Sequence, residues 1–182
     1  ACFALTSITL PSSITSIGNQ AFGNCTGLTS ITIPEGVTSI GNGAFFCCES
    51  LTNVTIPNSV TSIGNQAFDG CTSLEHISIP SSVNTIGKNC FSNSGLKNIA
   101  IPKSITSLSH GCFQGCSQLV NVDIPSSVTS IGYACFSGCT SLEAIAIPSS
   151  VTSIEGCIFK NCSNLKDVSL PSTLSTITYE SF

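Results

Sequence analysis

Twelve cysteines and two histidines are the side chains of this chain that could take part in covalent or metal chemistry. Seven cysteines recur 23 or 45 residues apart, namely Cys2, Cys25, Cys48, Cys71, Cys116, Cys139 and Cys162. Three others, Cys90, Cys112 and Cys135, form a second regular set. Neither set has the short clustered spacing of structural zinc ligands. The pattern therefore favours cysteines that act as small buried hydrophobes over metal ligands.

The second set of cysteines occupies a position that other repeats fill with alanine, such as Ala67, which indicates a small buried space. Disulfides between neighbouring repeats stay open as an alternative. A strand spacing of about 4.8 Å allows the Cα separation, whereas parallel stacked side chains oppose the torsion of about 90°. Cys47 and Cys157 lie outside both sets, and we predict that they are exposed, reactive thiols.

His76 and His110 are the candidate bases, and His110 precedes Cys112 by two residues, as in a Cys–His nucleophile pair. The repeat pattern directs Cys112 inward and His110 outward, so a surface histidine is the favoured interpretation. The sequence contains no Gly-x-Ser-x-Gly elbow and no phosphate-binding glycine loop. We therefore predict that the chain is not an enzyme and has no cofactor or metal site.

The element that positions all these residues is a repeat marked by proline. The eight prolines are separated by 23, 23, 23, 22, 23, 23 and 23 residues, and they are Pro11, Pro34, Pro57, Pro80, Pro102, Pro125, Pro148 and Pro171. With proline as position 0, positions +3, +6, +17, +20 and +22 are aliphatic, +11 is always Phe and +14 is mostly Cys. The 22-residue repeat is shortened between Phe91 and Leu96, where the Cys is lost. This regularity predicts one solenoid.

Each repeat predicts three local structures. The Ile-x-Ile segment before proline alternates and is β-branched, which predicts a strand that proline ends. The stretch from Val60 to Gly64 predicts a second extended segment. The spacing Ala67-Phe68-x-x-Cys71 suits a short helical or 3₁₀ turn, because residues three and four apart share one face.

These positions resemble the BspA-like leucine-rich repeat family, whose pattern is approximately Leu-x-x-Ile-x-Ile-Pro-x-x-Val-x-x-Ile-Gly-x-x-Ala-Phe-x-x-Cys. The resemblance covers residues 1–182. It implies an α/β solenoid with a parallel concave β-sheet, short extended segments and short helical or 3₁₀ turns on the convex side. Gly at +7 becomes Ser109, Glu155 and Thr178 in three repeats, so a positive φ at +7 is not obligatory. We expect one domain of about eight repeats that is a fragment of a longer protein.

The composition excludes several classes of partner. Only 8% of residues are charged, the net charge is −4, and the five basic residues are scattered lysines. This argues against nucleic acid, which requires a basic surface. No apolar run approaches the roughly 20 residues of a membrane helix, so we expect no membrane insertion in this segment. The glycosylation sequons at Asn24, Asn53 and Asn161 are explained by the abundance of Asn, Ser and Thr.

The exposed strand positions, +18, +19 and +21, vary more than the core. They are Thr and Ser in the first repeats and become charged from Glu75 onward. Since concave solenoid faces are the usual binding surfaces, we predict binding residues among Thr55, Glu75, His76, Ser78, Lys97, Asn98, Asn121, Asp123 and Glu143. Solvated positions without a ligand are an equally weighted alternative.

The resemblance implies a cell-surface or secreted protein. We accordingly predict a non-enzymatic adhesion module that binds a protein through the concave sheet, either host extracellular matrix or another cell-surface protein. One alternative is a structural spacer without a ligand. Another is an ice- or mineral-binding array, suggested by the Thr-Ser pair at +4 and +5, such as Thr61-Ser62. A Thr-x-Thr grid is absent, and the pair more simply satisfies backbone groups.

Overall fold

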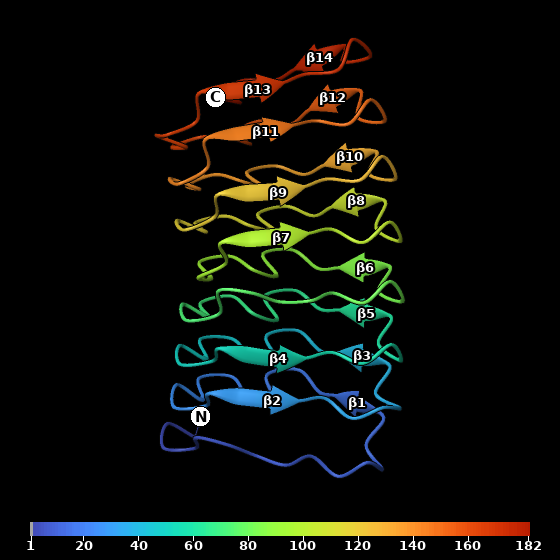
Figure 1. Ribbon diagram of the computed structural model, residues 1–182, viewed down its shortest axis with the longest axis vertical. Coiled ribbons are helices and arrows are strands. Elements are labelled where there is room, and N and C mark those ends of the chain that lie inside the picture. The colour runs from blue at the N-terminus through green and yellow to red at the C-terminus, as the bar shows by residue number, and fades with distance from the viewer. Residues whose placement is uncertain (1) are drawn as a thin grey trace.

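The computed structural model describes residues 2–182 as a stack of parallel turns, with the N-terminus at one end and the C-terminus at the other (Figure 1). We call the segment that starts at each proline a rung, from rung 1 at Pro11 to rung 8 at Pro171. In the shortened rung 4, positions after the deletion take the numbers of their equivalents elsewhere. Because each rung begins with the same residues, equivalent side chains stand above one another along the whole stack.

Two columns of short strands run the length of the stack. Three-residue strands lie just before the prolines: β2 (Ser30–Thr32), β4 (Asn53–Thr55), β7 (Asn98–Ala100), β9 (Asn121–Asp123), β11 (Ala144–Ala146) and β13 (Asp167–Ser169). Two-residue strands lie at +5 and +6: β1 (Ser16–Ile17), β3 (Ser39–Ile40), β5 (Ser62–Ile63), β6 (Thr85–Ile86), β8 (Ser107–Leu108), β10 (Ser130–Ile131), β12 (Ser153–Ile154) and β14 (Thr176–Ile177). Both extended segments of the predicted repeat are therefore confirmed.

Strands pair in parallel with the equivalent residues of the next rung. Ser16 pairs with Ser39 in the second column, and Ile31 pairs with Val54 in the first. The ladders are not continuous: one sheet contains β1-β3-β5-β6, and the others are the pairs β8-β10, β12-β14, β2-β4, β7-β9 and β11-β13. We call the exposed surface of the first column, at positions +18, +19 and +21, the strand face.

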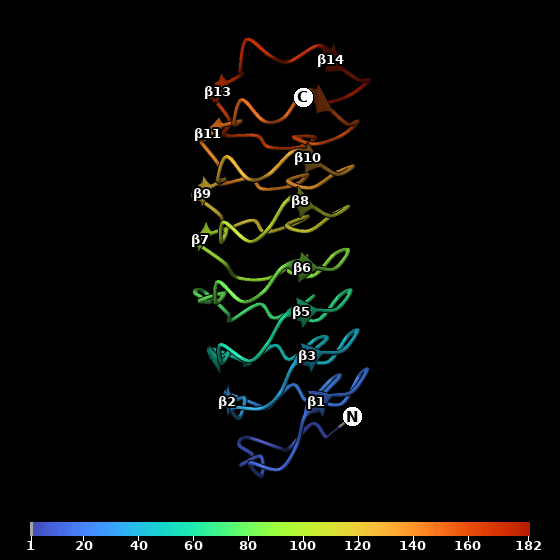
Figure 2. The same cartoon turned by 90° about the vertical axis from the view of Figure 1, so that its right-hand side faces the viewer.

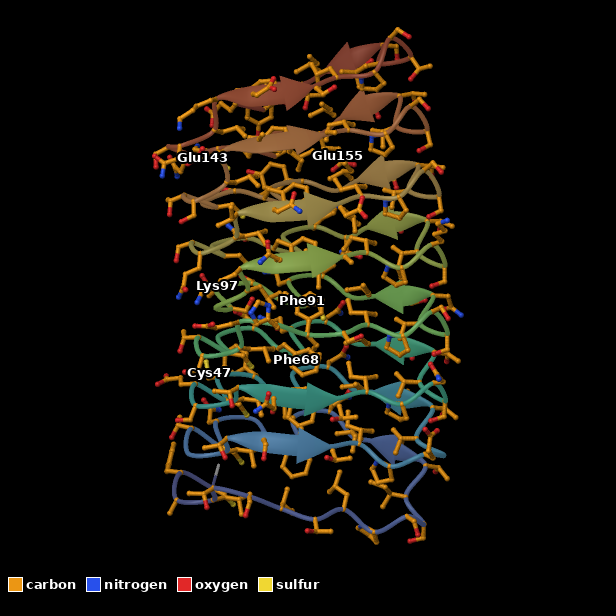
Figure 3. All side chains as sticks on the ribbon, in the orientation of Figure 1. Cys47, Phe68, Phe91, Lys97, Glu143 and Glu155 are labelled. Atoms are coloured by element: carbon orange, nitrogen blue, oxygen red, sulfur yellow. The ribbon has the colours of Figure 1, made fainter. Side chains whose placement is uncertain are left out.

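The core is a stack of phenylalanines at +11. From Phe22 to Phe159, neighbouring ring centroids are 5.3 to 6.1 Å apart and the rings lie within 10° of parallel. Figure 3 shows Phe68 and Phe91 above one another inside the stack. The aliphatic positions of the repeat surround these rings, and from Val37 to Ile154 they are almost fully buried except for the half-buried Val54 and Ile77. The predicted core is therefore confirmed.

Five cysteines at +14 donate hydrogen bonds to the backbone of this stack, and all five except the half-buried Cys162 are buried. The Sγ atoms of Cys48, Cys71, Cys116, Cys139 and Cys162 each donate to the carbonyl oxygen of the Phe in the preceding rung, at 3.0 to 3.2 Å. Each of these carbonyls also accepts a backbone N–H of its own rung, as Phe91 does from Ser94, so the thiol supplies a second hydrogen bond as well as volume. In the shortened rung, Ser94 takes the Cys position. It is 3% exposed, and its Oγ lies 3.4 Å from Cys116 Sγ.

The predicted helical or 3₁₀ turn is wrong. Residues 2–182 contain no helix, and the segment around each Phe is a series of turns. The cause is a pair of residues in the left-handed region, at +9 and +13. Position +9 has φ between 51° and 60° in all eight rungs, at Gln20, Gly43, Gln66, Asn89, Gly111, Ala134, Cys157 and Glu180. Left-handed residues four positions apart cannot belong to one right-handed helix.

Glycine occurs at +7 because there is little space for a side chain, and not because the backbone needs a positive φ. None of these glycines has a positive φ. A Cβ added to Gly41 would lie 2.6 Å from the backbone nitrogen of Asn19, and one added to Gly87 would lie 2.4 Å from that of Asn65. The glycine therefore allows two rungs to approach each other at this corner.

The expected concave curvature is also nearly absent, because the stack is almost straight in two perpendicular views (Figures 1 and 2). A helix is about 10 Å wide and would spread rungs that are about 4.8 Å apart at the strands. Here both columns are strands with the same spacing, so neither side is spread. No helix in residues 2–182 could span a membrane.

Candidate functional site

The strand face holds all nine residues predicted to bind a partner. Thr55 ends β4, Asn98 begins β7, and Asn121 and Asp123 lie in β9. Glu75, His76 and Ser78 lie in the equivalent segment of rung 3, and Glu143 precedes β11. All are exposed except Lys97, which is half-buried. Position +20 between them points inward, as at Ile99 and Val122, so the alternation of each strand produces this arrangement.

Four charges of this face neutralise one another in pairs between neighbouring rungs. Lys97 Nζ lies 2.7 Å from Glu75 Oε2, and Lys166 Nζ lies 3.2 Å from Glu143 Oε2. The hydrogen bond from Lys97 lowers the pKa of the Glu75 carboxyl. Figure 3 shows Lys97 and Glu143 on the same side of the stack. Because these carboxylates already have partners, they offer less free charge to a ligand than the sequence suggested.

The sheet is interrupted at rung 3, between β4 and β7. Among residues 2–182, none forms a backbone hydrogen bond with His76, Ile77 or Ser78. Figure 1 accordingly shows no arrow between β4 and β7 in the column of three-residue strands. A shallow depression of about 530 Å³ lies beside the interruption, lined by Thr52, Asn53, Thr72, Ser73, Glu75 and His76. The predicted stretch therefore coincides with a local change in structure as well as in composition.

A second hollow, of about 450 Å³, crosses β9, β11 and β13. Its central strand presents only Ala144 and Ala146, whose short side chains leave the floor low. Asp123 on β9 and Asp167 on β13 stand on either side of the alanines. Neither aspartate forms an ion pair with another residue in the described part of the chain. We call this feature, with Asn121 and Ser169 at its border, the alanine-floored hollow.

Sequence reasoning identified part of this hollow and missed the rest. Asn121 and Asp123 were predicted, whereas Asp167, Ser169 and the alanine floor were not. The missing signal was present at +19 and +21: only rung 6 has alanine at both positions, and both neighbouring rungs carry aspartate there. Alanine is a poor strand former compared with Thr, so strand formation does not explain the pair.

The two cysteines predicted to be exposed and reactive are not. Cys157 is only 4% exposed, and its Sγ lies 3.8 Å from Glu180 Oε2 of the next rung. Cys47 is half-buried, and burial together with the carboxylate of Asp69 raises its pKa. Both residues adopt the left-handed backbone that shapes the turns. They therefore belong to the repeat, at +9 and +13, where several residue types occur.

The cysteines of the two regular sets are free thiols, but the burial of most of them does not favour the reactive thiolate form. All twelve cysteines are unpaired by disulfides. Cys112 is fully buried, which raises its pKa, while His110 is exposed and lies 3.8 Å from Glu155. The predicted inward and outward orientations of this pair are thus confirmed, and the two do not form a nucleophile pair. Across the described residues, 2–182, no three His, Cys, Asp or Glu side chains cluster as metal ligands.

Comparison with protein families gives one match. The model of the BspA type leucine rich repeat region matches residues 1–119 and 86–182, with six copies of the repeat. Together these segments cover the whole chain. A comparison with curated proteins gave no match.

Three solved structures are similar to this chain, and the first two share its fold with TM-scores above 0.5. A leucine-rich repeat protein of T. pallidum is 29% identical with a TM-score of 0.63, over 92% of this chain and 71% of that one. The pneumococcal vaccine antigen PcpA is 23% identical with a TM-score of 0.61, over 90% of this chain and 50% of that one. A leucine-rich cell surface protein of Faecalibacterium prausnitzii is 28% identical with a TM-score of 0.46, over 92% and 64%.

Proposed function

Because this chain belongs to the BspA-type leucine-rich repeat family, we propose that it is a non-enzymatic module that binds another protein through its strand face. Leucine-rich repeat solenoids generally act as such modules, since the stacked rungs provide an extended surface. The core thiols give no support for catalysis. Burial raises the pKa of Cys90, Cys112 and Cys135 well above its usual range, and thiolates are the reactive form.

The alanine-floored hollow carries this proposal. Its two aspartates have no cationic partner within the described chain, whereas Glu75 and Glu143 do. A lysine or arginine of a partner could place its charged group near these carboxylates and its aliphatic stem over Ala144 and Ala146. We therefore infer a partner that presents a basic side chain, with the nine predicted residues forming the surrounding contact surface.

Surface exposure and adhesion extend this proposal. They rest on the family, whose members are commonly surface proteins of bacteria and protozoa. Host extracellular matrix and proteins of another cell surface are the proposed partners, because both would meet the strand face from outside the cell. The net charge of −4 is compatible with basic segments of such partners.

A capture experiment tests the proposal. The chain is immobilised and exposed to solubilised extracellular matrix, and bound proteins are compared with those on a variant carrying Asp123→Asn and Asp167→Asn. A control carries Ser30→Asn and Thr32→Asn, at +19 and +21 of rung 1. We expect capture to fall at least about tenfold with the first variant and to persist with the control. Equal capture by all three folded proteins would refute this site.

A rigid spacer is the second candidate, favoured by the use of surface hydroxyl groups within the stack. Ser59 Oγ donates to Val37 O at 2.8 Å, and Thr61 Oγ1 donates to Thr38 O at 3.2 Å. Thr129 repeats the second bond with Thr106. These bonds support the interpretation that Thr at +4 satisfies backbone groups, which leaves its hydroxyl group less available to an ice or mineral surface. The spacer predicts no protein bound at any concentration tested.

A further inference from the structure

Position +8 forms a separate edge of the stack, beyond the two-residue strands. Its residues are Asn19, Asn42, Asn65, Lys88, His110, Tyr133, Gly156 and Tyr179. In the first rungs these residues form a ladder. The Oδ1 atoms of Asn19, Asn42 and Asn65 each accept the backbone N–H of the +8 residue in the next rung, at 2.8 Å. We call this surface the +8 edge.

The asparagine ladder stops after Lys88. The backbone N–H groups of His110, Tyr133, Gly156 and Tyr179 have no acceptor among residues 2–182. Each ladder bond contributes about 1 kcal/mol, and rungs 1 to 3 show that the scaffold accommodates asparagine here. The replacement therefore loses the ladder hydrogen bonds, and in their place Tyr133 interacts with Cys157 and Tyr179. It leaves the backbone N–H groups of the exposed residues His110, Tyr133 and Tyr179 without an acceptor in the described chain.

Aromatic rings replace the ladder. The chain has two tyrosines and no tryptophan, and both tyrosines lie on the +8 edge of rungs 6 and 8. Tyr133 is 42% exposed and Tyr179 is 69% exposed. Gly156 lies between them, and a Cβ there would come within 3.3 Å of the Tyr179 ring. The absence of a side chain at this position thus lets the ring lie across rung 7.

Paired charges surround the rings. Lys160 Nζ lies 2.6 Å from Glu180 Oε2, and His110 Nε2 lies 3.8 Å from Glu155 Oε2. The ring of His110 is 6.4 Å from that of Tyr133. Lys160 already pairs with the Glu180 carboxylate, so this carboxylate attracts an external cation only weakly. The negative charges of Glu155 and Glu180 disfavour an anionic ligand. The edge therefore suits an uncharged ligand that can both donate and accept hydrogen bonds.

We propose that the +8 edge of rungs 5 to 8 binds a neutral saccharide. The apolar C–H face of a sugar ring would pack on Tyr133 and Tyr179, which present flat, amphipathic surfaces. Its hydroxyl groups would accept from the free backbone N–H groups and donate to Glu155 and Glu180. This combination of aromatic faces and a few convergent polar groups is typical of small-ligand sites. The site is separate from the strand face.

The two tyrosines allow a direct test. Because the chain has no tryptophan, its intrinsic fluorescence comes mainly from the proposed site. The chain is titrated with chitohexaose, cellohexaose and mannohexaose, and with poly-lysine as a charged comparison. We expect a saturable fluorescence change with at least one of the three saccharides and none with poly-lysine. No change with any saccharide, or a change with poly-lysine alone, would overturn the proposal.

Variants then separate this site from the strand face. Calorimetry with the saccharide that binds is repeated on a Tyr133→Leu, Tyr179→Leu variant and on an Asn42→Ala variant, which alters the same edge in rung 2. We expect affinity to fall at least about tenfold in the first and to stay unchanged in the second. Capture of matrix proteins by the tyrosine variant should be unaffected. Unchanged saccharide affinity in the folded tyrosine variant would contradict the assignment.

Discussion

Rungs 1 to 3 and rungs 5 to 7 bury equivalent side chains and expose different ones. Phe45 and Phe136 are both fully buried in the same stack. On the strand face, Thr32 of the first group corresponds to Ala146 of the second, in the floor of the hollow. On the +8 edge, Asn42 with its ladder bond corresponds to Tyr133, which has none.

The difference shows where the repeat is constrained. A buried side chain contacts its equivalents above and below, so a change must suit both neighbouring rungs. An exposed side chain is less constrained, although some, such as Asn42 and Glu75, bond to a neighbouring rung. Departures that cost the fold something, such as the lost asparagine ladder or alanines at two strand positions, are therefore the most informative about function. Both occur in the C-terminal half of the molecule.

The largest effect should be a loss of stability that is similar in rungs 1 to 3 and in rungs 5 to 7. Phe68→Ala and Phe136→Ala each remove one ring from the stack, and we expect each to lower the free energy of unfolding by about 3–5 kcal/mol. Urea denaturation followed by circular dichroism measures both. A loss below about 1 kcal/mol in only one half would show that the two halves do not share one core.

The thiol hydrogen bond should matter less. Cys116→Ala removes one of the two donors to the Phe91 carbonyl, which keeps the backbone N–H of Ser94, and we expect a loss of about 1–2 kcal/mol in unfolding free energy. Cys116→Ser keeps a donor, and the natural Ser94 shows that serine fits this position. It should retain most of the stability. Equal losses in the two variants would indicate that volume, and not the hydrogen bond, determines the residue.

Exchanging the +8 residues of the two halves should change the free energy of unfolding by smaller amounts and in opposite directions. Asn42→Tyr removes the acceptor for the Asn65 N–H, and we expect a loss of about 1 kcal/mol. Tyr133→Asn places an acceptor below the Gly156 N–H and should restore a similar amount. The same denaturation experiment measures both. Destabilisation by Tyr133→Asn would mean that the ring has a structural role that the ladder does not replace.

The smallest expected effect is a change in the pH at which one tyrosine, Tyr133, titrates. The neighbouring Cys157 and Tyr179 raise the pKa of Tyr133 from 10.0 to about 12. A pKa raised by folding stabilises the folded state below the unfolded value and loses that contribution as pH rises through the folded value. We expect a phenolate absorbance step near pH 12 that is absent in Tyr133→Phe. Identical titration curves for the two proteins would refute the interaction.

The proline period predicted the buried positions, because the same positions are buried in every repeat. Val60, Ile63, Phe68 and Leu74 are all fully or almost fully buried, as their positions require. The turns were harder to predict. Left-handed backbone at +9 is occupied by Gln20, Ala134 and Glu180 as well as glycine, so residue type gives little indication of it. Without that information the Phe–Cys spacing resembled a helix.

The candidate site was only partly predictable for a related reason. Exposed positions could be identified by column, but ion pairs and hollows arise between rungs. Glu75 and Lys97 are 22 residues apart and neutralise each other. Asp123 and Asp167, on either side of the alanines, form no ion pair within residues 2–182. Sequence order alone does not show which neighbouring rung supplies a partner. Comparing the same column in three successive rungs would have revealed the hollow.

One pair of substitutions tests the central claim that the hollow, and not the strand face in general, binds the partner. Ala146→Arg fills the hollow and supplies a cation to Asp123 and Asp167, whereas Thr32→Arg makes the matched change at +21 of rung 1. Capture of proteins from solubilised extracellular matrix is measured alongside the melting temperature. We expect Ala146→Arg to abolish capture and Thr32→Arg to preserve it, with both proteins folded. Equal capture by the two variants would contradict the account.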